Sequence, residues 1–164
     1  MIHYLCCNKS NQMRQVQNFN PKHNYLKYWR VVRHWVTKSN DLSVADLDIL
    51  LFLYDERYFR RADFLKVNRV VRWERDQFNR LIESGWIDIF RIREGYTGAR
   101  FEISRKGRHL MSSMYKKLSG EEAISEDSRY NPLFKNDVSY TDKVVRNEIK
   151  EMNKAIRLKL HLAQ

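Results

Sequence analysis

Residues that cross-link or break a chain are scarce in this sequence. Its 164 residues include two cysteines, two prolines and five glycines. The cysteines, Cys6 and Cys7, are neighbours, and disulfide geometry does not favour a bridge between adjacent residues. Because no disulfide framework is present, we expect a protein of the reducing cytoplasm rather than a secreted one.

Long apolar runs are missing as well, and so is the pattern of a secretory leader. No segment approaches the roughly 20 apolar residues that a membrane-spanning helix needs. Residues 2–7 are mostly apolar, but they are too few for the hydrophobic part of a signal peptide, and no basic stretch precedes them. The sequence therefore predicts a cytoplasmic protein without a membrane partner.

The residue patterns of common active sites are also absent. The five histidines are scattered, and no Ser–His–Asp set, carboxylate pair or glycine-rich phosphate loop is recognisable. His3, Cys6 and Cys7 are potential metal ligands, but they lack a fourth ligand at a suitable spacing. We therefore predict no enzymatic activity, no metal site and no cofactor.

What the sequence has in excess is positive charge. Lys and Arg number 31 against 20 Asp and Glu, which gives a formal net charge of +11. Such a balance favours an anionic partner, either a nucleic acid or an acidic membrane surface. Residues 57–109 contain 14 basic and 7 acidic residues, and 12 of those 14 are arginines. The planar fork of arginine suits phosphate and guanine, which favours the nucleic acid.

The first part of the chain predicts a loose arm followed by two helices. Residues 1–21 have no sustained hydrophobic period and are expected to form a flexible arm. In residues 22–42, apolar residues recur every three or four positions, which predicts an amphipathic helix. A second helix is expected from residue 43 to about residue 55, with Ser43 and Asp46 as a capping box. Its strongly apolar sequence predicts a place in the centre of the core.

Residues 43–118 are predicted to form a winged helix-turn-helix domain. A short extended piece is expected at residues 58–60, followed by a short helix at 61–67 and a turn at Asn68. The next segment, residues 70–84, has an apolar face and a basic face, and it predicts the helix that enters a DNA groove.

A β-hairpin and a further helix complete this domain. Gly85 stands where a helix C-terminus commonly has a glycine. Residues 86–93 and 99–104 each alternate between apolar and polar side chains, and the glycine-containing turn at 94–98 joins them. Ser104 is then expected to cap a helix that ends near residue 118.

The chain ends in a predicted long helix whose apolar stripe needs a cover. Residues 119–138 form a predicted connector, and residues 139–164 a helix without internal glycine or proline. This stripe and that of the first helix can pack within one chain or against a second copy. The central elements alone would leave both stripes uncovered, so we predict a homodimer. The residues assigned to dimerisation are Tyr25, Trp29, Val32, Val36, Val145, Ile149, Met152, Ile156 and Leu160.

Outward side chains of the basic helix and the hairpin are candidates for contacts with DNA. Arginine pairs with guanine and asparagine with adenine in the major groove, whereas the hairpin can reach the minor groove. The alternative is an ordinary amphipathic helix beside a hairpin with solvated arginines; the order of the elements and the charge excess favour the interface. The predicted DNA-binding residues are Arg69, Arg72, Trp73, Arg75, Asp76, Asn79, Arg80, Arg91, Arg93, Tyr96 and Arg100.

The order of these parts resembles the MarR family of bacterial winged-helix regulators. The matching segments are residues 42–50, residues 79–87 and residues 100–107, the last with Ser-Arg-Lys-Gly after the second strand. The resemblance implies a homodimer joined through the terminal helices, a recognition helix in the major groove and a wing at the minor groove. Carried over by position, the groove-facing residues are Arg72, Trp73 and Asp76, and the wing arginine is Arg100.

We therefore expect a mainly α protein that binds double-stranded DNA as a dimer and regulates transcription, as a repressor that occludes a promoter. The alternative is a non-enzymatic winged-helix adaptor whose arginines face acidic partners in a larger complex. Binding of RNA is a third option, which the lack of an aromatic-rich sheet disfavours. The sequence supports no particular small-molecule effector.

Overall fold

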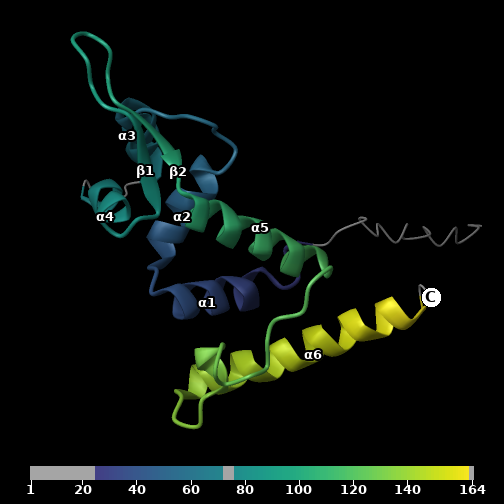
Figure 1. The fold of residues 1–164 in the computed structure, drawn as a ribbon. Coiled ribbons are helices and arrows are strands. Elements are labelled where there is room, and N and C mark those ends of the chain that lie inside the picture. Colours follow the sequence, from purple (N-terminus) through teal and green to yellow (C-terminus); the bar gives the residue numbers. More distant parts are fainter. Residues whose placement is uncertain (1–24, 72–75, 163–164) are drawn as a thin grey trace, which may run out of the picture.

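The computed structural model describes residues 25–71 and 76–162, and for residues 67–71 and 159–162 it describes the backbone alone. The described chain is mainly helical, with six α-helices and one two-stranded antiparallel sheet. Three helices, a hairpin and a further helix follow α1, an order consistent with a winged-helix arrangement (Figure 1). The elements are α1 (Trp29–Asn40), α2 (Val44–Leu53), α3 (Arg61–Val71), α4 (Gln77–Glu83), β1 (Ile87–Arg91), β2 (Arg100–Ile103), α5 (Arg105–Ser119), the 3-10 helix η1 (Pro132–Phe134) and α6 (Tyr140–Leu162).

Local chemistry sets the boundary between α1 and α2. Helix α1 ends at Asn40 because Asp41 adopts a left-handed conformation, with a φ of 52°. The capping box predicted for α2 is confirmed: Ser43 Oγ accepts from the Asp46 backbone N–H at 3.1 Å, and the Ser43 N–H donates to the Asp46 carboxylate at 3.1 Å. The central place of α2 in the core is also confirmed by its fully buried side chains, Leu47, Ile49, Leu50 and Leu53.

A cluster of phenylalanines joins the hairpin to the helices. Phe59 forms an antiparallel bridge with Phe101, with N···O distances of 3.0 and 2.9 Å, which confirms the extended piece predicted around it. The Phe78 ring packs edge-on against Phe101 with 5.1 Å between the ring centroids, and the Phe64 ring lies 5.2 Å from that of Phe78. The hairpin base therefore rests on α3 and α4 through aromatic contacts.

The bounds predicted for the basic helix, residues 70–84, are wrong. Helix α3 runs through Val71, and α4 begins only at Gln77, with Asp76 in a turn before it. The turn expected at Asn68 falls inside α3. Asparagine is only moderately unfavourable in a helix, so this residue does not by itself force the chain to turn.

The inward alternation predicted for residues 86–93 holds only at the base of the hairpin. Trp86 and Ile87 are buried, whereas Ile89 is 54% and Ile92 74% exposed. In β2, Phe101 and Ile103 are buried as predicted. Figure 1 shows the reason, because the hairpin projects beyond the helices, and only its base lies against the core. The outer half of β1 therefore has no core to face.

The connector predicted at residues 119–138 is bound to α6 by hydrogen bonds. The Ile124 backbone N–H donates to Asn153 Oδ1 at 3.0 Å, and Asn153 Nδ2 donates to the Ile124 carbonyl at 2.8 Å. Arg146 Nε donates to the carbonyl of Leu133, within η1, at 2.8 Å. These bonds hold the connector along α6, which in turn lies beside α1 (Figure 1).

Most of the apolar stripe residues assigned to dimerisation are buried inside a single chain. Val32, Val36, Ile149 and Met152 are 0% exposed and Ile156 is 5% exposed. Trp29 and Val145 are partly buried, Tyr25 is 42% exposed, and the side chain of Leu160 lies outside the described residues. A second copy is thus not needed to cover these stripes, and the homodimer remains a prediction.

Candidate nucleic-acid interface

The hairpin between β1 and β2, which we call the wing, is braced at its tip and at its base. Glu94 and Thr97 exchange two backbone hydrogen bonds, with N···O distances of 3.2 and 2.9 Å, around a two-residue turn. Gly95 has a φ of +54°, as the first central position of a type II′ turn requires. Nearer the base, the centroids of the Tyr58 and Phe90 rings lie 4.1 Å apart. The wing therefore presents its side chains from a defined backbone.

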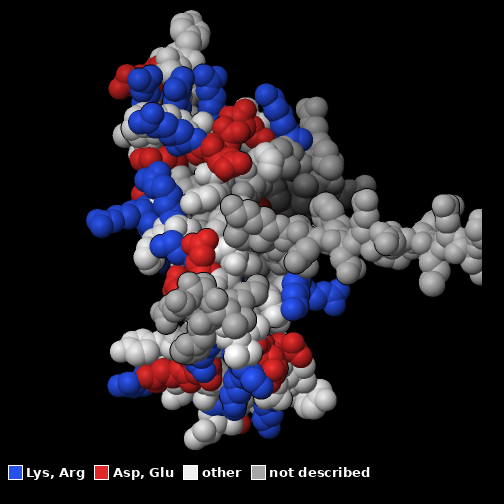
Figure 2. Space-filling view, turned by 90° about the vertical axis from the view of Figure 1, so that its right-hand side faces the viewer, with Lys and Arg blue, Asp and Glu red and all other residues white. Residues whose placement is uncertain are grey.

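Three of the predicted DNA-binding arginines lie together on the wing. Arg91 and Arg93 are exposed and Arg100 is half-buried. Arg91 and Arg100 are partners in the strand register, so two positive charges stand opposite each other across the hairpin. Within the described part of the chain, none of these three guanidinium groups forms an ion pair or a side-chain hydrogen bond. Figure 2 shows Lys and Arg side chains gathered around the wing at the top of the molecule.

This cross-strand arginine pair has an energetic consequence. Like charges directly opposite each other weaken a hairpin, because their repulsion is not offset by packing. An anion that contacts both guanidinium groups would replace this repulsion with attraction. An anion held between Arg91 and Arg100 would therefore stabilise the hairpin.

Helix α4 contributes a polar contact that the sequence did not indicate. Arg61 Nη2, from α3, donates to Asn79 Oδ1 at 2.7 Å, and its guanidinium carbon lies 5.7 Å from the centroid of the Phe78 ring. Asn79, predicted to read a base edge, thus has its amide oxygen occupied within the protein. The pair joins residues 18 positions apart in sequence, so helical periodicity gives no signal for it.

The remaining predicted contacts are only partly placed by the structure. Asp76 and Arg80 are exposed at α4, and Arg80 makes a further interaction within the molecule. Arg72, Trp73 and Arg75 lie outside the described residues, and so does the side chain of Arg69. The described site is therefore the wing together with the exposed side of α4.

Two more cations belong to the surroundings of the wing. The Arg57 guanidinium carbon lies 5.3 Å from the centroid of the Tyr58 ring, which itself packs on Phe90. By contrast, Arg108 forms an ion pair with Glu102 at 3.1 Å, so one cation near the base of the wing is already neutralised. Sequence reasoning counted Arg57 in the basic region but did not place it beside the wing.

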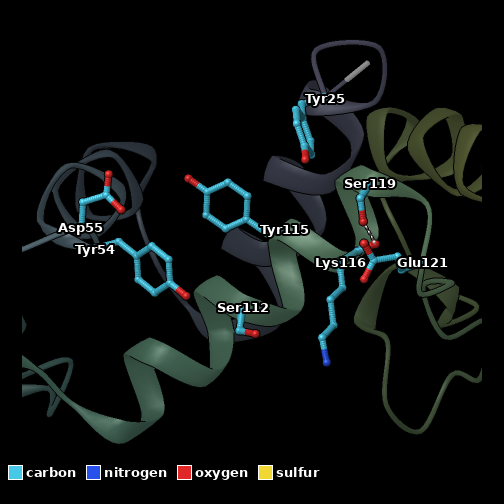
Figure 3. Close-up of a pocket in the computed structure, with 8 residues that line it drawn as sticks. All are labelled: Tyr25, Tyr54, Asp55, Ser112, Tyr115, Lys116, Ser119 and Glu121. Carbon is cyan, nitrogen blue, oxygen red and sulfur yellow. Dashed lines mark hydrogen bonds between the residues drawn. The ribbon is translucent and has the colours of Figure 1, made fainter. Parts of the chain in front are cut away.

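A separate hollow of about 430 Å³ lies towards the other end of α5 (Figure 3). The rings of Tyr54 and Tyr115 stack at its wall with 5.7 Å between their centroids, and Tyr25 lines the same space. Asp55 and Glu121 add carboxylates at its rim. Figure 1 shows that this end of α5 points away from the wing, so the hollow is not part of the basic site.

No group of three or more metal-ligating side chains is present in the part of the chain that the structure describes. His3, Cys6 and Cys7, the metal candidates of the sequence, lie outside that part. In residues 25–71 and 76–162, no helix has both the length and the apolar character that crossing a bilayer requires.

Comparisons of the chain with protein-family models, with curated proteins and with solved structures find no match. The winged-helix interpretation therefore depends on the order of the elements and on the geometry of the wing.

Proposed function

We propose that this chain binds double-stranded DNA through the wing and α4 and regulates transcription. The observation that carries the proposal is the cross-strand pair Arg91 and Arg100, joined by Arg93, all without a carboxylate partner among the described residues. Three guanidinium groups without a carboxylate partner on a braced hairpin suit electrostatic contacts with a phosphate backbone.

In this proposal the two parts of the site have different tasks. The wing arginines attract phosphates whatever the base sequence, and exposed side chains at α4, such as Asp76, approach base edges. The hydrogen bond from Arg61 to the Asn79 amide oxygen limits the conformations that this amide adopts. Two copies would read half-sites about one turn of DNA apart, and occupation of a promoter would repress it.

Salt dependence tests the proposal. The purified chain is titrated into a fluorescent duplex of random sequence at salt concentrations from 50 to 200 mM, values chosen to cover the steep range of counterion release. The logarithm of the binding constant should fall linearly with the logarithm of the salt concentration. Replacing both Arg91 and Arg100 with Ala should make this negative slope shallower by about 2. Each lost phosphate contact reduces the magnitude of the slope by about 0.9.

Lys154→Ala serves as the matched control, since Lys154 is an exposed cation on α6 rather than on the wing. This variant should keep the slope of the unaltered protein. A salt-independent signal, or an unchanged slope in the double variant, would exclude the wing as the phosphate-binding element. Absence of duplex binding at every salt concentration would instead favour the adaptor alternative, with an acidic protein as the partner.

A further inference from the structure

The outer half of the wing exposes apolar side chains, although the ring of Tyr58 covers part of Phe90. Beyond Ile87, every residue of β1 is exposed, although Ile89 and Phe90 are apolar. Ile92 follows β1 and is 74% exposed. A two-stranded hairpin gains little stability from water-exposed apolar groups, so this part of the wing is held by its strand pairing and its turn rather than by a core.

The extreme tip of the wing carries an aromatic ring. Tyr96 occupies the second central position of the turn and is 109% exposed, so it makes essentially no contact with the rest of the molecule. The backbone beneath it is held by the two Glu94–Thr97 hydrogen bonds and by the left-handed Gly95. A ring at this position is directed outward without any loop rearrangement.

Arginines flank this ring on both strands, and the exposed carboxylate of Glu94 lies in the turn beside it. Arg91 and Arg93 precede the turn, Arg100 follows it, and none is paired with a carboxylate in the described residues. The minor groove of B-DNA is about 6 Å wide, so a side chain at the tip of a hairpin can enter it where a helix does not fit. Proteins that kink DNA from the minor groove combine an inserted apolar side chain with basic side chains that contact the groove.

We propose that Tyr96 acts as a wedge that enters the minor groove, partly unstacks one base step and bends the duplex, while the flanking arginines hold the adjacent phosphates. The inference rests on the proposed function, because it assumes that the wing contacts DNA. It adds a means of selection, since pyrimidine–purine steps such as TA unstack most easily. The chain would then prefer sites with a flexible step beneath the wing, even where no side chain reads the bases.

Ring closure of short DNA measures this bending without knowledge of the operator. The probe is a linear duplex of about 100 bp with cohesive ends, shorter than the persistence length of about 150 bp, so that ligase alone rarely closes it. Binding of the unaltered chain should raise the rate of ring closure by roughly tenfold or more, as a bend of tens of degrees brings the ends together. Duplex affinity is measured in parallel by fluorescence anisotropy.

Three variants separate the wedge from the charge. Tyr96→Ala should lose the gain in ring closure while it keeps most of the affinity, and Tyr96→Phe should restore the gain because the ring is retained. Tyr140→Ala is the matched control, since Tyr140 is 82% exposed at the start of α6. It should behave as the unaltered chain does. A competition between duplexes with and without TA steps should favour the former, and Tyr96→Ala should abolish the preference.

The outcomes distinguish the wedge from the proposed function. Duplex binding without accelerated ring closure would overturn the wedge and leave DNA binding intact, and so would equal bending by the Tyr96→Ala variant. No duplex binding at all would overturn the proposed function, and the wedge with it.

Discussion

Asp142 is the buried carboxylate that ties the start of α6 to α1. It is 7% exposed, its Oδ1 lies 2.7 Å from His34 Nε2, and its Oδ2 lies 4.0 Å from Lys38 Nζ. Burial on its own raises the pKa of Asp142. Hydrogen bonds from His34 and Ser139, together with the nearby positive charge, outweigh burial and leave this pKa below its ordinary value of 3.8.

This lowered pKa predicts how acid affects stability. Because the folded pKa of Asp142 lies below the unfolded one, the ionised carboxylate stabilises the fold above pH 3.8. That contribution is lost as the pH falls through the lowered folded pKa. Asp142→Asn should therefore reduce the free energy of unfolding by about 1–3 kcal/mol at pH 5, and the difference from the unaltered protein should shrink on further acidification.

Urea titrations followed by circular dichroism at a series of pH values measure this difference. The exposed Asp137 supplies the control, since Asp137→Asn should change stability little at any pH. A deficit for Asp142→Asn that stays constant down to the most acidic sample would show that packing, rather than the ionised group, sets the effect.

Gly107 lies where helix α5 comes close to the base of the wing. A Cβ at this position would lie 2.6 Å from Ile103 Cγ2 and 3.1 Å from the Trp86 carbonyl oxygen. The Trp86 carbonyl already accepts a hydrogen bond from the Ser104 N–H at 3.0 Å, and Ile103 is buried. Neither neighbour can move without loss of an existing contact.

Gly107→Ala should for this reason destabilise the protein. Alanine is better than glycine inside a helix by about 1 kcal/mol, but overpacking of a buried contact costs about 1–3 kcal/mol, and more where backbone must shift. The midpoint of thermal unfolding measures the net effect of helix propensity and overpacking. Gly98→Ala is the comparison, because a Cβ at residue 98 meets no atom within 4 Å and this variant should unfold near the temperature of the unaltered protein. An equal or raised midpoint for Gly107→Ala would contradict the close approach.

The elements that the sequence predicts correctly are those whose signals lie within a few residues of one another. The capping box of Ser43 and Asp46, the cap at Ser104 and the two wing strands depend on neighbours a few positions away, and the structure has each of them. The turn preference of Asn68 is also a local signal, but it is weak, and the residue lies inside α3.

In the candidate site, too, local features were predicted and contacts between distant segments were not. The wing arginines were identified from composition and from the order of the elements, and the structure has Arg91 opposite Arg100 in the strand register. The contact of Arg61 with Asn79 and the position of Arg57 beside Tyr58 arise from segments that only the fold brings together. Local sequence carries no information about such contacts.

Over the whole molecule, the last helix closes the core from within the chain. The connector reaches α6 through the buried Asn153, whose side chain bonds both backbone groups of Ile124. Ile124 and Leu133 are both 1% exposed and belong to the same hydrophobic core as the buried residues of α1 and α6. From the sequence the two terminal stripes look uncovered, because the part of the core that the connector supplies has no periodic pattern.

The fully buried Ile149 distinguishes a core stripe from an interface between copies. Ile149→Ala should lower the free energy of unfolding by roughly 2–5 kcal/mol, because it leaves a cavity between α6 and its neighbours in the same chain. Val144→Ala, at a position on α6 that is 45% exposed, should cost far less. Denaturant titration gives the stability of each variant, and light scattering after size exclusion gives its mass. The mass of the Ile149→Ala variant should equal that of the unaltered protein. The opposite result would be an Ile149→Ala variant with unchanged stability and half the mass of the unaltered protein. It would show that this stripe joins two subunits, as expected from the sequence alone.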